Sequence, residues 1–156
     1  MSIARRITDP YNKKNKRNEH NTKIENYNCG GYAFGIFSWL HCNTDRKPLD
    51  YCYCENAYQR KKVRDDCVAH LLRTVPNIRV VRRDEHLNPD EYLVAFRMST
   101  HDFHFIKQKP DGSWWHKSGR TEIRPFEGNP FGREWKRRDG APSYRYKITL
   151  FAVKER

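Results

Sequence analysis

The sequence predicts an α+β fold, in which helices near the N-terminus pack on an antiparallel β-sheet. Three observations lead to this prediction. Apolar residues recur with a helical period over residues 57–73, strand-like alternation begins after residue 78, and residues 109–112 have the composition of a hairpin turn. Because the helices come first and the strands follow as a meander, the sequence favours helices on one side of a sheet.

The length of the chain fits a single domain. It has 156 residues, of which 13% are aromatic, so we expect one core built partly from rings. Residues 1–24 are polar and basic and predict a loose N-terminal arm. Residues 25–156 form the predicted folded domain.

Two helices are predicted in the first half of the domain. Residues 26–31 carry a turn signal, and residues 32–40 form an apolar run that is typical of a central buried helix. We expect Gly35 within this run to permit close packing against the sheet. The second helix spans residues 57–73, and its predicted apolar face consists of Val63, Cys67, Val68, Leu71 and Leu72.

The second half of the chain predicts the antiparallel strands. Residues 88–90 and 109–112 have turn composition, and residues 118–142 are irregular and rich in Gly, Pro and Arg. Strand patterns occur in residues 78–82, 92–98, 103–107, 113–117 and 144–153.

The charge of the chain favours polyanionic partners. There are 31 Lys and Arg residues against 19 Asp and Glu, which gives a net charge of +12. Nucleic acid, an anionic envelope polymer or an acidic protein fits such a surface, and the alternative is that the charge only maintains solubility. A basic run with an aromatic ring predicts a phosphate-binding patch, with a solvated loop as the alternative; its residues are Arg133, Trp135, Lys136, Arg137 and Arg138.

The cysteines and the first residues indicate the compartment. The chain has five cysteines, an odd number that argues against a closed disulfide framework. The first residues contain no apolar signal region, and no run approaches the roughly 18 apolar residues that span a membrane. We therefore expect synthesis in a reducing cytoplasm, with any action outside requiring lysis or non-classical secretion.

Cys42, Cys52 and Cys54 raise the alternative of a zinc site, completed by His41 or Cys67. Cys52 and Cys54 are separated by a single residue, which is the spacing C-x-C. The paired ligands of structural zinc sites are normally separated by more residues. We therefore predict neither a metal nor a cofactor.

Cys29 is the predicted nucleophile. It follows Asn28 at the start of the apolar segment, where the N–H groups of a helix N-terminus lower the pKa of a thiol. Gly30 and Gly31 are expected to leave room for a substrate. The backbone N–H of Cys29 is placed to donate to an oxyanion, and Asn28 and Gly30 are the predicted positioning residues beside it.

His104 is the predicted base and His116 its orienting partner. His104 lies within a strand, and we expect it to face the helical layer, where it can take the thiol proton. With the turn near residue 110, positions 104 and 116 fall almost opposite each other and point to one face. His116 then holds the His104 ring in the required tautomer. Asp102 shares a face with His104 and could assist the site, but it is displaced along the strand, and we interpret it as a surface-loop residue.

Two segments resemble the NlpC/P60 and CHAP groups of papain-like cysteine hydrolases. The sequence NCGGYA at residues 28–33 resembles the segment that opens their central helix with the nucleophile. Residues 103–116 resemble their hairpin, in which a base histidine begins a strand and a second polar residue, often histidine, follows twelve positions later. The resemblance covers residues 26–40 and 92–117, which together are 41 of the 156 residues.

The resemblance implies a papain-like fold for residues 25–156 and an enzyme that hydrolyses or transfers an acyl group through a thioester. It makes Cys29 the nucleophile and His104 and His116 the rest of the triad, with Tyr27 as the candidate for the tyrosine that assists the oxyanion. The implied activities are those of a peptidase, amidase, deamidase or acyltransferase. The implied substrate is a peptide or protein amide, a peptidoglycan stem amide or a glutamine side chain.

The alternative function is that of a non-enzymatic binding protein on a papain-like scaffold. A small basic domain can compete with nucleic acid and inhibit a partner, as a phage factor that blocks a host defence complex would do. Such a protein would use the arm of residues 1–24 and the basic segment of residues 133–138, with an idle triad.

Overall fold

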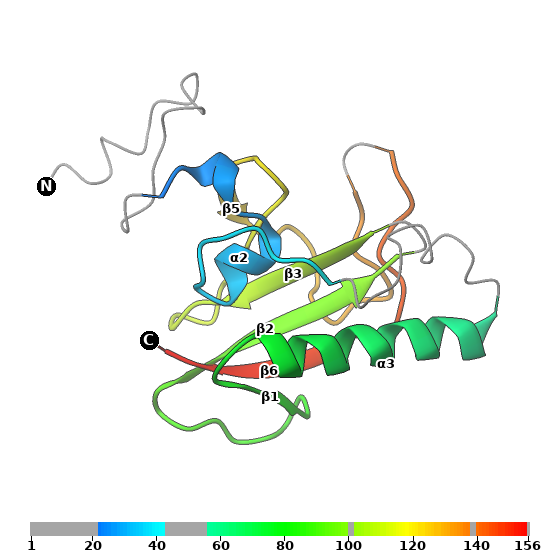
Figure 1. Cartoon of the computed structure of the whole chain (residues 1–156), viewed down its shortest axis with the longest axis horizontal. Coiled ribbons are helices and arrows are strands. Elements are labelled where there is room, and N and C mark those ends of the chain that lie inside the picture. The colour runs from blue at the N-terminus through cyan, green and yellow to red at the C-terminus, as the bar shows by residue number, and fades with distance from the viewer. Residues whose placement is uncertain (1–21, 43–55, 100–101, 138–139, 156) are drawn as a thin grey trace, which may run out of the picture.

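A computed structural model describes residues 22–42, 56–99, 102–137 and 140–155. At its centre is a six-stranded antiparallel sheet with the strand order β1-β6-β2-β3-β4-β5, and helices lie against it (Figure 1). The α+β prediction is therefore confirmed. The elements are η2 (Ile24–Asn26), α2 (Cys29–Ala33), α3 (Ala57–Thr74), β1 (Ile78–Val81), β2 (Glu91–Met98), β3 (Phe103–Gln108), β4 (Trp114–Lys117), β5 (Ile123–Pro125) and β6 (Thr149–Lys154).

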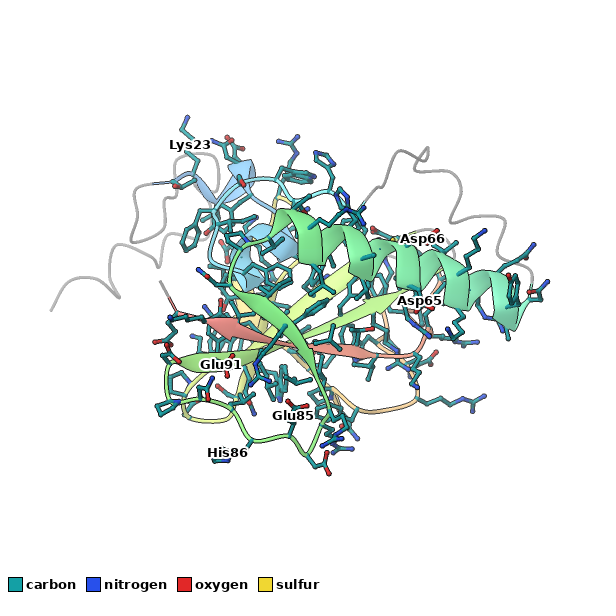
Figure 2. The ribbon with its side chains drawn as sticks, turned by 60° about the horizontal axis from the view of Figure 1, so that its bottom comes forward. Lys23, Asp65, Asp66, Glu85, His86 and Glu91 are labelled. Atoms are coloured by element: carbon teal, nitrogen blue, oxygen red, sulfur yellow. The ribbon has the colours of Figure 1, made fainter. Side chains whose placement is uncertain are left out.

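The two faces of the sheet serve two different cores. On one face Phe96 and Phe105 pack with residues of α2 and α3, and Figure 2 shows α3 lying along this side of the sheet. On the other face Ile106 packs with Trp135 and Tyr144, which come from the segment between β5 and β6. Because successive side chains of a strand point to opposite faces, neighbouring residues of β3 belong to different cores.

Helix α3 confirms the predicted helix to within a residue. The Asn56 side chain caps its start by accepting a hydrogen bond from the N–H of Gln59 at 2.9 Å. The residues that α3 buries are Val63, Cys67 and Leu71. Leu72 is 44% exposed, so the predicted apolar face was too wide at this position.

Helix α2 is much shorter than the predicted helix over residues 32–40, and that prediction is wrong. The helix has five residues, and Gly35 follows it with a φ of +67°. The N–H groups of Ile36 and Phe37 both donate to the Gly31 carbonyl at 3.1 Å. These bonds turn the chain back on itself, so Gly35 ends the helix, as glycine commonly does.

The strand boundaries and the turn of the central hairpin match the sequence prediction. Strands β1 to β4 begin and end within one residue of their predicted positions. The turn at residues 109–112 closes with a 2.9 Å hydrogen bond from the Gly112 N–H to the Lys109 carbonyl, and Gly112 has a φ of +89°. Local turn chemistry therefore fixes the connection between β3 and β4.

The end of the chain departs from the prediction. Strand β5 lies within the segment predicted to be irregular, and β6 begins at Thr149 rather than at residue 144. Tyr144 instead pairs with Trp135 in an isolated bridge, through mutual backbone hydrogen bonds of 2.9 and 3.0 Å. This bridge holds a loop over the face of the sheet that carries Ile106.

Residues 1–21 of the predicted arm lie outside the described residues. Ile24 is buried in a cluster with Tyr27 and Tyr32, so packed structure already includes the last residue assigned to the arm. Among the helices that the structure describes, none has the length and apolar character needed to cross a membrane.

Replacing Gly31 with alanine is expected to lower the free energy of unfolding by about 3 kcal/mol, because the new methyl group overpacks the segment. An added Cβ would lie 2.0 Å from the Ser38 carbonyl oxygen. Urea unfolding measures the effect. The control is Gly112→Asn, at a positive φ with no atom within 4 Å of the added Cβ, which should cost less than about 1 kcal/mol. Equal stabilities of the two variants would contradict the close approach of α2 to Ser38.

Candidate active site

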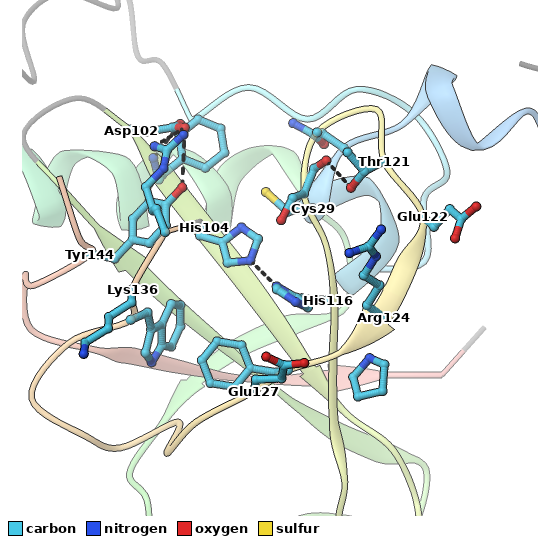
Figure 3. Close-up of a pocket in the computed structure, with 18 of the residues that line it drawn as sticks. Cys29, Asp102, His104, His116, Thr121, Glu122, Arg124, Glu127, Lys136 and Tyr144 are labelled. Atoms are coloured by element: carbon cyan, nitrogen blue, oxygen red, sulfur yellow. Dashed lines mark hydrogen bonds and ion pairs between the residues drawn. The ribbon is translucent and has the colours of Figure 1, made fainter. Parts of the chain in front are cut away.

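Cys29, His104 and His116 line one pocket of about 900 Å³ (Figure 3). Asp102 and Tyr144 also line it. The pocket lies where the start of α2 meets β3 and β4, with the loop that leads to Tyr144 on the other side. The three residues singled out in the sequence therefore come together in space.

The two histidines form a hydrogen-bonded pair. His104 Nε2 and His116 Nδ1 lie 2.8 Å apart (Figure 3). The register differs from the predicted one, since His116 pairs with Ile106 rather than with residue 104. Positions 104 and 106 share a face of β3, so the rings still meet, along a diagonal of the sheet. This contact engages Nε2 of His104, so a proton exchange with Cys29 would use Nδ1.

His104 does not face the helical layer, which corrects the prediction. Phe105 takes that face and packs edge-on against Phe34 at the end of α2, with ring centroids 5.1 Å apart. The His104 ring stacks on Tyr144 on the opposite face, with centroids 5.4 Å apart. Successive side chains of a β-strand point to opposite faces of the sheet, so His104 and its neighbour Phe105 cannot share a face.

Cys29 reaches the pocket at the edge of β3. The β3–β4 pairing ends at Ile106 and His116, and the backbone N–H of Phe105, one residue further along β3, acts on the Cys29 thiol and lowers its pKa. The thiol therefore lies beside the strand, between its two faces. This position lets a residue of the helical layer share a pocket with His104.

The Cys29 thiol is not activated in the way that the sequence predicts. Burial raises its pKa to about 12, against hydrogen bonds from the N–H groups of Phe105 and Gly30 that lower it. The charge of Asp102 adds to the rise in pKa, and that of Lys117 opposes it. A helix of five residues offers little compensation for desolvating a fully buried group, so Cys29 is a neutral thiol near pH 7.

His104 is also neutral near pH 7. Burial, with smaller contributions from the neighbouring His116 and Arg137, lowers its pKa to about 3. A neutral imidazole can accept a proton, which is the state that a general base requires.

Asp102 and Tyr144 are site residues that the sequence did not identify. Asp102 Oδ2 accepts a 3.1 Å hydrogen bond from Arg137 Nη1, and the Tyr144 hydroxyl lies 3.5 Å from the same oxygen. The interpretation of Asp102 as a surface-loop residue is therefore incomplete, because it lines the pocket and anchors Arg137. Its position next to the strand of His104 was the one available signal.

The predicted positioning residues beside Cys29 have mainly structural contacts. Asn28 Nδ2 donates to the Leu40 carbonyl at 2.7 Å, and Asn28 Oδ1 accepts from the N–H groups of Leu40 and Gly31 at 3.0 and 3.1 Å. The side chain thus clamps the start of α2 to residue 40. An added Cβ on Gly30 would lie 2.3 Å from Leu40 Cδ2, so packing rather than substrate access requires this glycine.

Tyr27 is fully buried in a cluster away from the residues that line the pocket. Its ring packs edge-on against Phe37 with centroids 5.4 Å apart. The Tyr27 carbonyl accepts a hydrogen bond from Lys117. These contacts support the segment before Cys29 rather than an oxyanion role for the Tyr27 ring.

The predicted phosphate-binding patch does not form as a stacking surface. Trp135 is 1% exposed, and its Nε1 donates to the Pro130 carbonyl at 2.8 Å. Arg137 pairs with Asp102, and Arg138 lies outside the described residues. Arg133 and Lys136 are exposed. A buried ring cannot stack on a base, so the aromatic part of the prediction is wrong.

Two of the cysteines considered for a zinc site, Cys52 and Cys54, lie outside the described residues. Cys42 and Cys67 are buried thiols, and burial together with their mutual hydrogen bond raises the pKa of Cys42. Over the described ranges, no group of three or more His, Cys, Asp and Glu side chains is arranged to hold a metal ion.

Comparisons with models of known protein families, with curated proteins and with solved structures give no match for this chain.

The stability of the protein should fall steeply in mild acid because of His104. Its pKa is about 3 in the folded state against 6.5 ordinarily. The unfolded chain therefore takes up a proton below pH 6.5 that the folded chain excludes, which costs about 1.4 kcal/mol per pH unit towards pH 3.

His104→Gln removes this titrating group. The free energy of unfolding of the variant should therefore fall less steeply with decreasing pH than that of the wild type, by about 1.4 kcal/mol per pH unit. Urea unfolding at a series of pH values between 7 and 4 measures the slopes. The control is His86→Gln, an exposed loop residue (Figure 2), which should keep the wild-type slope. Parallel slopes for His104→Gln and the wild type would contradict a neutral buried His104.

Proposed function

We propose that this protein is a papain-like cysteine hydrolase that acts on amide bonds through Cys29, His104 and His116. The observation that carries the proposal is the 2.8 Å contact between His104 Nε2 and His116 Nδ1, in the pocket that Cys29 lines. A nucleophile, a neutral base and a group that orients the base are the parts that such chemistry needs.

The tautomer of the base follows from the histidine pair. For His104 to accept a proton at Nδ1, its own proton must lie on Nε2, where it donates to His116 Nδ1. His116 then carries its proton on Nε2. As His104 takes up a proton, the hydrogen bond from its Nε2 to His116 Nδ1 keeps the ring in place.

The reaction proceeds in two halves. Cys29 attacks the carbonyl carbon while His104 takes the thiol proton, and His104 then gives this proton to the leaving amine, which leaves a thioester. Water attacks the thioester and gives a proton to His104, and the proton returns to the sulfur as the acid departs. When an amine takes the place of water, the same site transfers the acyl group.

The oxyanion of each tetrahedral intermediate needs a donor. The first N–H groups of a helix have no acceptor within the helix, and Cys29 is the first residue of α2. The Asn28 side chain already caps the Gly31 N–H. The backbone N–H of Cys29 is therefore the donor that we assign to the oxyanion.

Cys29 and His104 do not form a thiolate–imidazolium pair before a substrate binds. With the thiol pKa near 12 and the His104 pKa near 3, both groups are neutral before a substrate binds. Proton transfer then accompanies the attack of sulfur on the carbonyl.

The alternative, a non-enzymatic binding protein with an idle triad, draws support from the burial of Cys29, which is 5% exposed.

Acetylation by p-nitrophenyl acetate tests the proposal without knowledge of the natural substrate. We expect a stoichiometric burst of nitrophenolate and one acetyl group on Cys29, located by mass spectrometry of peptides. His104→Ala should acylate about 100-fold more slowly, because the general base is lost. Cys29→Ala should show no burst.

The matched control is Cys67→Ala, which removes a buried thiol on α3 and should keep the burst. Absence of the acetyl group from wild-type Cys29 would contradict the hydrolase and favour the binding protein. The same conclusion would follow if His104→Ala acylated Cys29 at the wild-type rate.

A further inference from the structure

Lys117 is a fully buried lysine at the end of β4. Its side chain is 0% exposed, and Nζ donates hydrogen bonds to the carbonyls of Tyr27 and Gly119. The same atom lies 4.6 Å from the centre of the Tyr27 ring. Across the described residues no carboxylate pairs with it, so its charge is compensated by carbonyl dipoles and a ring face.

A lysine is a costly residue in such a place. Burial lowers the pKa of Lys117 to about 8, an effect that Cys29 opposes and Arg120 reinforces. The group is therefore largely protonated at pH 7, despite its burial. A methionine of similar length would fill the same space without a buried charge, so packing alone does not explain the ammonium.

The contacts of Lys117 converge on the nucleophile. The Tyr27 carbonyl precedes Cys29 by two residues, and Gly119 belongs to the loop after β4 that lines the pocket. The charge of Lys117 also acts on the Cys29 thiol, in the sense opposite to Asp102. One ammonium thus ties the nucleophile segment to a pocket wall and favours negative charge at the sulfur.

We propose that Lys117 is a positioning residue for Cys29, whose buried ammonium fixes the nucleophile segment and stabilises the charge that develops on sulfur during attack. The proposal rests on the assignment of Cys29 as the nucleophile. It adds a fourth residue to the triad, one that acts through Cys29 and does not touch the substrate.

The pH range of this effect follows from the groups around the ammonium. They are Cys29 from α2, the Tyr27 ring from the segment before α2, and Arg120 from the loop after β4. Below pH 8 the ammonium is charged and assists thiolate formation. As the pH rises through about 8 it loses its proton and the assistance fades.

Alkylation of Cys29 by iodoacetamide tests the proposal, with the modified peptide identified by mass spectrometry between pH 6 and 9. In the wild type, the logarithm of the rate should rise less steeply above pH 8 than below it. In Lys117→Met the rate at pH 7 should fall about tenfold, the change expected if the loss of one nearby charge raises the thiol pKa by about one unit. The bend near pH 8 should disappear as well.

Lys109→Met is the matched control, because Lys109 belongs to the same hairpin but lies over Trp115. It should keep the wild-type rate and bend. A Lys117→Met rate and slope equal to the wild type would overturn the proposal. So would a wild-type profile with constant slope through pH 8, a result that decides the matter even if Lys117→Met does not fold.

The experiment is independent of turnover. If alkylation responds to Lys117 as expected while p-nitrophenyl acetate leaves no acetyl group on Cys29, the hydrolase is wrong and the role of Lys117 at the thiol stands. If Cys29 is acetylated but its alkylation rate is the same in Lys117→Met and the wild type, the proposed hydrolase stands. Lys117 then only stabilises the structure through its hydrogen bonds to Tyr27 and Gly119.

Discussion

The point where β3 and β4 stop pairing is the constraint on which the site depends. The β3–β4 pairing ends at Ile106 and His116, and just beyond it the backbone N–H of Phe105 acts on the Cys29 thiol and favours its charged form. The opening lets α2, which packs on one face of the sheet, place its first residue next to a histidine of the other face. The Asn28 side chain, bonded to Leu40 and Gly31, holds α2 in this position.

Burial decides the protonation states around this opening. It keeps both the Cys29 thiol and the His104 imidazole neutral, and it leaves Lys117 as a cation held by carbonyls and an aromatic ring. Burial of these groups strengthens the electrostatic interactions that form during attack, while it disfavours charges at rest. The chemistry that we propose therefore begins with neutral partners.

Strands β1 to β4 and the histidine pair were predictable because their signals are local. Turn composition at residues 109–112 and the twelve-residue spacing of His104 and His116 suffice to bring both rings to one face. The length of α2 was mispredicted although Gly35, at a positive φ, is a local stop signal; the contacts of Ser38 and Leu40 with Gly31 and Gly30 are packing that no local pattern reports. The pKa of Cys29 and the burial of Trp135 and Lys117 depend on tertiary structure that no local pattern reports.

The distance between Cys29 Sγ and His104 Nδ1 tests the central claim most directly. In a crystal structure determined near neutral pH, we expect the two atoms within hydrogen-bond reach, roughly 3 to 4 Å, after at most a rotation about the Cys29 Cα–Cβ bond. His104 Nε2 should remain bonded to His116 Nδ1. A sulfur that stays in the apolar core, where no such rotation brings it to the ring, would contradict a nucleophile and base at this site.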